Sequence, residues 1–220
     1  MMTAKASTAK STPDAIISRF MNYVLEHGEI PVSVYKFCKE NKIKEEEFYA
    51  FFGSFQGLEK AIWNTFYTKT ESLLQKNKAY EQYDNREKLL TFFYTFFEML
   101  TLNRSYVLLV LEGNKDRLNS LQQLSGLRRH IRAFGKMLAE DRNSERQYQI
   151  SKFTPGLIAE GVWVQFLFLL KFWMNDSSAG FERTDVAIEK SVNTVFEVFD
   201  RAPFDSIIDF GKFLYGERMS

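Results

Sequence analysis

Apolar residues recur every three or four positions along almost the whole chain, and this spacing limits the folds open to it. Residues with that spacing lie on one face of an α-helix, whereas a half-buried strand needs strict alternation. Thr12 and Gly28 are residue types that begin and end helices, and they bracket the first such segment. The sequence therefore predicts an all-α protein. The predicted helices cover residues 13–27, 33–40, 45–52, 55–77, a segment beginning at 85, and then 104–112, 115–140, 155–174 and 183–200.

Two of the later helices carry apolar residues suited to packing between helices. Helix 155–174 has one apolar stripe at Trp163, Phe166, Leu170 and Trp173, and a second at Val164, Phe168 and Phe172. Helix 183–200 has a seam at Ile188, Val192, Val195 and Phe199. A helix that is apolar on two sides usually packs against its own core and against a neighbour. We therefore expect a helical bundle here.

The composition favours a folded protein and indicates neither a strongly basic nucleic-acid binder nor a disordered acidic chain. Hydrophobic residues make up 45% of the 220 residues, and the formal net charge is +1. The single cysteine, Cys38, excludes an internal disulfide and fits a reducing compartment. The longest uncharged apolar run, 161–170, is shorter than the roughly 20 residues that span a bilayer. We expect a cytoplasmic protein without a transmembrane segment.

The residues that could carry chemistry do not form a catalytic or metal-binding pattern. The two histidines, His27 and His130, are far apart in sequence, and no spacing matches a metal site or a phosphate-binding loop. We therefore predict that the protein is not an enzyme, with no catalytic residues, no metal and no cofactor.

Residues 33–62, SVYKFCKENKIKEEEFYAFFGSFQGLEKAI, resemble the helix-turn-helix of the TetR family of bacterial regulators without a gap. Ser33 stands at the start of the first motif helix, Cys38 takes the place of a small packing residue, and Ile43 is the apolar residue of the turn. The run from Phe48 to Ser54 matches the end of the second motif helix. The rest of the chain resembles the family in the order and length of its helices.

The resemblance implies a three-helix head over 13–60 after a flexible arm at 1–12, and a larger ligand-binding and dimerisation domain over 61–220. It implies a homodimer that binds DNA and responds to an apolar small molecule or lipid. The implied DNA-binding residues are Ser33, Lys36, Lys39, Lys42, Lys44, Glu45, Glu46 and Tyr49. The implied ligand pocket is formed by Phe92, Phe96, Phe97, Tyr106, Trp163 and Phe166. The implied dimer interface contains Phe168, Phe172, Ile188, Val192, Val195 and Phe199.

The surface that would face DNA departs from the family pattern. Lys42 and Lys44 stand where the family usually has glycine and a serine or threonine cap, and the next helix opens with three glutamates, 45–47. Acidic residues stabilise a helix N-terminus, but they repel a phosphate backbone. Over residues 13–60, six lysines and arginines face eight acids, a net charge of −2. The sequence therefore predicts weakened DNA readout.

Two other functions remain open. One is a lipid- or isoprenoid-binding protein of the same fold that no longer binds DNA, resembling an accessory protein of ubiquinone biosynthesis. Its extra amphipathic helix would correspond to residues 203–216, which instead could pack on the body. The other is a dimeric interaction module with neither activity.

Overall fold

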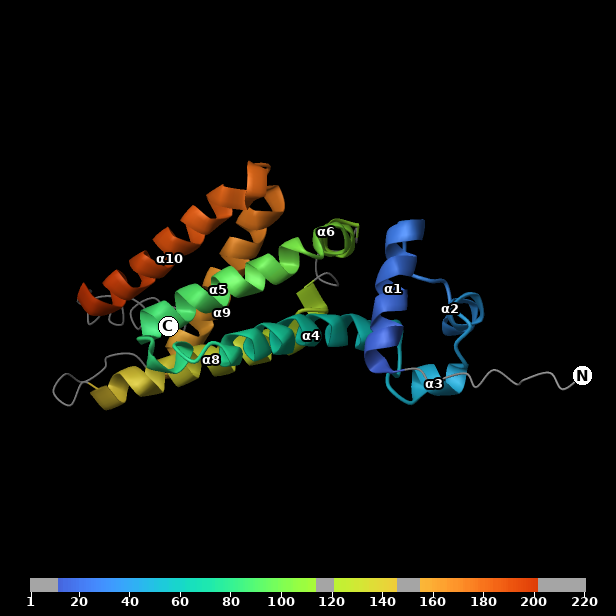
Figure 1. Ribbon diagram of the computed structural model, residues 1–220, viewed down its shortest axis with the longest axis horizontal. Helices are drawn as coiled ribbons and strands as arrows, with labels where there is room; N and C mark the ends of the chain where they lie inside the picture. The colour runs from blue at the N-terminus through green and yellow to red at the C-terminus, as the bar shows by residue number, and fades with distance from the viewer. Residues whose placement is uncertain (1–11, 114–120, 146–154, 202–220) are drawn as a thin grey trace, which may run out of the picture. The chain divides into compact units, whose positions relative to one another are not determined.

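The computed structural model describes residues 12–113, 121–145 and 155–201, and every regular element in these ranges is a helix (Figure 1). The prediction of an all-α fold is confirmed. The helices of the first half are α1 (Pro13–His27), α2 (Val34–Glu40), α3 (Glu45–Tyr49), α4 (Phe55–Lys76), the 3-10 helix η1 (Tyr80–Gln82), α5 (Asn85–Thr101) and α6 (Arg104–Glu112). They are followed by α8 (Ser125–Glu145), α9 (Pro155–Asn175), the 3-10 helix η2 (Ala179–Phe181) and α10 (Glu182–Arg201).

Local chemistry sets both ends of α1, as the sequence predicts. The Thr12 side chain accepts a hydrogen bond from the backbone N–H of Ala15 at 3.2 Å. At the other end, Gly28 adopts φ +71°, and its N–H donates to the carbonyl of Val24 at 2.9 Å. Glycine enters this left-handed conformation without steric cost. Both ends therefore follow from residues within the helix and its immediate flanks.

Two predicted helix boundaries are wrong. The predicted helix 45–52 ends earlier, at Tyr49. The predicted helix 115–140 is interrupted by a turn at Gln123 and Leu124, so α8 begins at Ser125 and continues to Glu145. The turn is held by a tertiary contact, because the Trp63 indole donates to Gln123 Oε1 at 2.8 Å. The polar stretch after residue 139 continues the helix because glutamate and arginine are good helix formers.

Close contacts divide the chain into two compact units, residues 1–70 with 98–130, and residues 71–97 with 131–220. The chain passes from one unit to the other within α4, α5 and α8. The predicted head boundary at residue 60 falls inside α4. The first unit contains more than the predicted head because α6 packs against α1. The domain boundary at residue 60 stays a prediction.

Each unit has an aromatic core. In the first, the Phe37 ring lies 6.0 Å from the ring of Phe20 and 5.8 Å from that of Phe55. In the second, the Phe166 ring lies 5.6 Å from Phe96 and 5.4 Å from Trp163. Ring pairs at these distances add to the hydrophobic stabilisation of a core. Phenylalanines therefore contribute to both cores.

Helix α9 is long and apolar enough to cross a bilayer by length and composition, although the sequence run of ten residues suggested otherwise. Half of its most apolar window is buried within the protein. A close approach to α8 explains part of that burial, since a side chain at Gly135 would meet Val162 Cβ at 3.1 Å. The other half of that window is not buried in the described part of the protein.

Asp176 joins the end of α9 to the start of α10. Its Oδ1 accepts from the Ser178 N–H at 2.9 Å and hydroxyl at 2.7 Å, and its Oδ2 accepts from the Thr184 N–H at 2.9 Å and hydroxyl at 2.7 Å. Burial opposes ionisation of Asp176, but these hydrogen bonds outweigh it and lower its pKa from 3.8 to about 2. The Asp176 carboxylate therefore holds the segment between α9 and α10 in place through four hydrogen bonds.

Replacing Asp176 with asparagine is expected to lower the Tm at pH 7 by roughly 4–8 °C, because charge-assisted hydrogen bonds contribute about 2 kcal/mol. The folded-state pKa lies below the unfolded value, so the stabilisation is present above the ordinary pKa of 3.8 and is lost as the pH falls towards about 2. The Tm difference between the two proteins should therefore shrink across that window. Thermal unfolding of Asp176→Asn and the exposed control Glu197→Gln measures this. A difference that stays constant down to pH 2 would contradict the assignment.

Candidate functional site

The turn between α2 and α3 lies where the sequence predicts the turn of a helix-turn-helix. Lys42 has φ +55°, the left-handed conformation that favours glycine, at the position where the family usually has glycine. Ile43 is buried, and its N–H donates to the carbonyl of Cys38 at 2.9 Å. The Arg19 guanidinium from α1 also donates to the carbonyl of Asn41. These contacts hold the turn although a lysine replaces the glycine.

The start of α3 lacks a side-chain cap, as predicted from Lys44. Glu45 and Glu46 are exposed there. Burial, with the negative charges of Glu45 and Glu47, raises the pKa of the Cys38 thiol to about 11. Cys38 is therefore a protonated packing residue in α2 and not a reactive thiol.

All eight predicted DNA-binding residues lie at the surface of the first unit. They are Ser33, Lys36, Lys39, Lys42, Lys44, Glu45, Glu46 and Tyr49. The side chain of Tyr49 is 53% exposed. The Ser33 hydroxyl caps α2 by accepting from the Lys36 N–H at 3.2 Å, and the Lys39 ammonium lies 6.0 Å from the centre of the Tyr35 ring. The short segment 36–47 therefore carries four exposed lysines together with the three glutamates 45–47.

Five of the six predicted ligand-pocket residues pack against one another in the second unit. Phe92, Phe96, Phe97, Trp163 and Phe166 are all buried. Their rings touch as neighbours of a packed core, for example Phe97 and Phe166 at 6.0 Å. The sixth residue, Tyr106, belongs to the first unit. A pocket around these residues stays a prediction.

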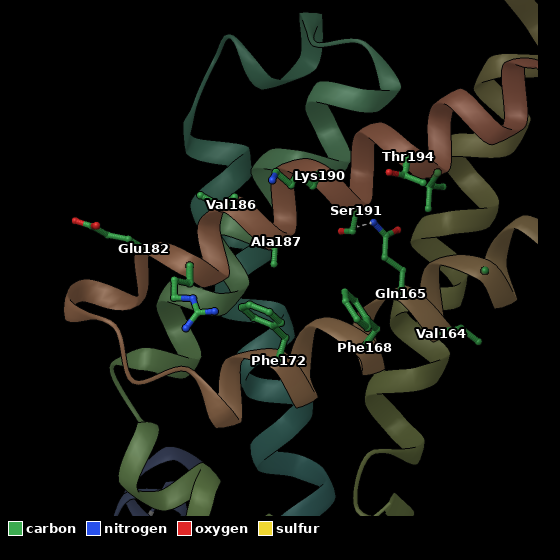
Figure 2. A pocket seen from close by; sticks show the side chains of 13 residues that line it. Val164, Gln165, Phe168, Phe172, Glu182, Val186, Ala187, Lys190, Ser191 and Thr194 are labelled. Carbon is green, nitrogen blue, oxygen red and sulfur yellow. Dashed lines mark hydrogen bonds between the residues drawn. The ribbon is translucent and has the colours of Figure 1, made fainter.

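The second unit contains an apolar groove between α9 and α10 with a volume of about 880 Å³. Figure 2 shows Phe168 and Phe172 rising from α9 towards α10, with Val186 on the facing helix. The Gln165 amide donates to the Ser191 hydroxyl at 3.0 Å and ties the two helices together (Figure 2). Along the groove, α9 and α10 thus present an exposed apolar face.

The predicted interface residues divide into two sets. Phe168 is 56% exposed, and Phe172 and Val195 are half-buried and line the groove. Ile188 and Val192 are completely buried inside the chain, because α10 turns this side of its seam to its own core. The side chain of Phe199 lies outside the described residues.

A comparison with known protein families identifies the family of this chain. Residues 88–214, more than half of the chain, match the model described as tetracyclin repressor-like, C-terminal domain. The chain belongs to the TetR family. The matched range lies beyond the helix-turn-helix segment, so the two similarities complement each other along this TetR family chain. No curated protein matches the chain.

Sequence reasoning missed two features of this TetR family protein. The first is the α10 side of the groove, formed by Val186, Lys190 and their neighbours, where polar residues interrupt the apolar pattern. The second is the buried acid Glu59 in α4. A signal for the second was present, because Glu59, Trp63 and Phe66 recur at helical spacing on one buried face.

Proposed function

We propose that this protein is a homodimeric transcriptional regulator that binds DNA through α2 and α3 and responds to an apolar ligand. The observation that carries the proposal is the helix-turn-helix turn, in which Lys42 keeps the backbone conformation of a glycine. A left-handed lysine costs about 1–2 kcal/mol, and the turn between α2 and α3 adopts this conformation despite that cost. Membership of the TetR family supports the same function.

DNA contacts are proposed for the exposed lysines of the motif and for Tyr49. Lys36, Lys39, Lys42 and Lys44 would neutralise phosphates, and Glu45 and Glu46 would face the groove. A helix-turn-helix reads bases near the N-terminus of its second helix. Glutamate can accept a hydrogen bond from cytosine, while its charge weakens the attraction to phosphate. We therefore expect sequence-specific binding with a low non-specific affinity.

The dimer is proposed to form through the groove between α9 and α10. Val164, Phe168 and Val186 expose apolar surface there, and Phe172 and Val195 extend it. Two copies of the face would bury one another around a twofold axis. Ile188 and Val192 would support this face from behind.

Ligand binding is proposed to occur in the body and to alter the heads through the helices that pass between the two units. Such coupling needs two states that the ligand and the DNA bind with different affinities. The aromatic side chains around Phe96 and Phe166 would rearrange to admit an apolar molecule.

Gel-shift measurements with DNA from upstream of the protein's own gene test the regulator. Retardation is expected at low salt and should weaken steeply as salt is raised, since phosphate contacts release counterions. An unshifted band even at low salt would overturn DNA binding.

Removing the charges of α3 is expected to strengthen DNA binding. Replacing both Glu45 and Glu46 with glutamine should raise the affinity roughly fivefold at low salt, because two charges that repel phosphate disappear. The gain should shrink as salt screens the remaining charges. The matched control replaces two exposed acids, Glu26 in the last turn of α1 and Glu29 just after that helix, and should change the affinity little. A lower affinity in the α3 variant would instead indicate that these glutamates read bases.

A second candidate function is lipid binding without DNA binding, favoured by the volume and apolar lining of the α9–α10 groove. Arg183 and Lys190 also line it and would suit an anionic headgroup. Native mass spectrometry of the protein purified from its host distinguishes the two functions. A retained lipid together with no DNA retardation would favour this alternative, and protein without lipid that shifts DNA would favour the regulator.

A further inference from the structure

A second cleft, separate from the α9–α10 groove, lies within the first unit and has a volume of about 500 Å³. It is lined by the segment before α2, the end of α3, the first turns of α4, and the glutamines before α8. The lining residues that matter here are Ile30, Val32, Tyr49, Phe55, Glu59 and Gln123. The cleft therefore combines an apolar wall with a small number of polar groups, as small-molecule sites do.

Glu59 is the buried acid of this cleft. Its side chain is only 7% exposed and lines the cleft; its carboxylate is not completely enclosed, and it forms no hydrogen bond or ion pair with the described residues. The N-terminal turn of α4 does not use it, because the Ser54 hydroxyl accepts from the Gly57 N–H at 3.1 Å. Glu59 is thus a buried charged group without a structural role in capping the helix.

The groups around Glu59 do not supply a partner. Gln123 is already engaged, since its Oε1 accepts from the Trp63 indole at 2.8 Å and its Nε2 donates to the carbonyl of Val110 at 3.4 Å. The Tyr106 hydroxyl is buried without a hydrogen-bond partner. The pKa of Tyr106 is raised, mainly by burial and also by the charge of Glu59. The two groups therefore interact electrostatically.

An unpaired carboxylate in this position is unfavourable in the empty protein. Burial raises the pKa of Glu59 above 4.5 because the charged form loses hydration. A cation that donates hydrogen bonds would restore the interactions of the charged form. Lys60 also lines the cleft, but it is half-exposed, so water and salt screen its repulsion.

We propose that this cleft binds a small organic cation, with an ammonium or amidinium group against the Glu59 carboxylate and an apolar body against Phe55, Ile30 and Val32. The proposal stands apart from the proposed DNA binding and from the apolar ligand of the body. Because Tyr49 lines the same cleft, the bound cation would lie next to a residue proposed to contact DNA.

Calorimetric titration with benzamidine tests the proposal, with the neutral isostere benzamide as the matched probe. Benzamidine is expected to bind at least roughly tenfold more tightly than benzamide at low salt, since one charge-assisted hydrogen bond accounts for a factor of that size. Glu59→Gln should remove this preference. Glu26→Gln, which changes an exposed acid of α1, should keep it.

Thermal unfolding of the same variants shows whether Glu59→Gln is still folded, so that a loss of binding is not mistaken for a loss of structure. Glu59→Gln removes an unpaired buried charge, so its Tm at neutral pH should be equal to or higher than that of the native protein. Equal binding of benzamidine and benzamide would overturn the proposal, as would benzamidine binding that survives in folded Glu59→Gln. Neither outcome depends on whether the protein binds DNA, so failure here is distinguishable from failure of the proposed regulator.

Discussion

Replacing Phe168 with glutamate is expected to convert the proposed dimer to a monomer. The Phe168 side chain is 56% exposed and lines the α9–α10 groove, and the proposed dimer would bury it against a second copy. Glutamate at this position would place an unpaired charge at the centre of the interface. Such a charge costs at least about 3 kcal/mol, so dimerisation should weaken more than roughly a hundredfold. Analytical ultracentrifugation over a concentration series measures the change.

The matched control for this experiment is Leu102→Glu. Leu102 is 76% exposed, follows α5 in the first unit and does not line the groove. The control should dimerise like the native protein and have a similar Tm. A Phe168→Glu protein that remains dimeric would place the interface elsewhere, and a native protein that is monomeric would remove the basis of the prediction.

Replacing Phe37 with alanine is expected to destabilise the first unit by about 3–5 kcal/mol, because the change leaves a cavity in a packed aromatic core. Phe37 is completely buried. Its ring lies 6.0 Å from Tyr23 of α1, 6.2 Å from Phe48 of α3 and 5.8 Å from Phe55 of α4, so one side chain links four helices. Urea denaturation followed by circular dichroism measures the loss. The proposed DNA binding should also fall in this variant, since the turn between α2 and α3 packs on the same core.

Tyr35→Ala serves as the comparison in the same helix. Tyr35 is exposed, and the Lys39 ammonium lies 6.0 Å from the centre of its ring. Its removal should change the stability by no more than about 0.5 kcal/mol. If both variants lost the same stability, the loss in Phe37→Ala could not be assigned to the packed core around its ring.

Much of the local structure around α2 and α3 could be predicted because it depends on contacts between close neighbours in sequence. Ile43 and Phe48 are buried as the motif requires, and Lys44 leaves α3 without a side-chain cap. The conformation of Lys42 could not be read from its residue type, because lysine rarely adopts a positive φ. The surrounding contacts impose it, including the hydrogen bond from Arg19.

The sequence by itself determined the all-α class and the ends of helices such as α1, because helical spacing and capping depend on residues within a few positions of one another. Only the tertiary structure decided which apolar residues face outwards. Ile188 and Phe168 look equally suited to an interface in the sequence, yet one is buried and the other is exposed. The turn at Gln123 and the burial of Glu59 also depend on the tertiary structure. Burial depends on which distant segments pack together, and neither periodicity nor composition records those partners.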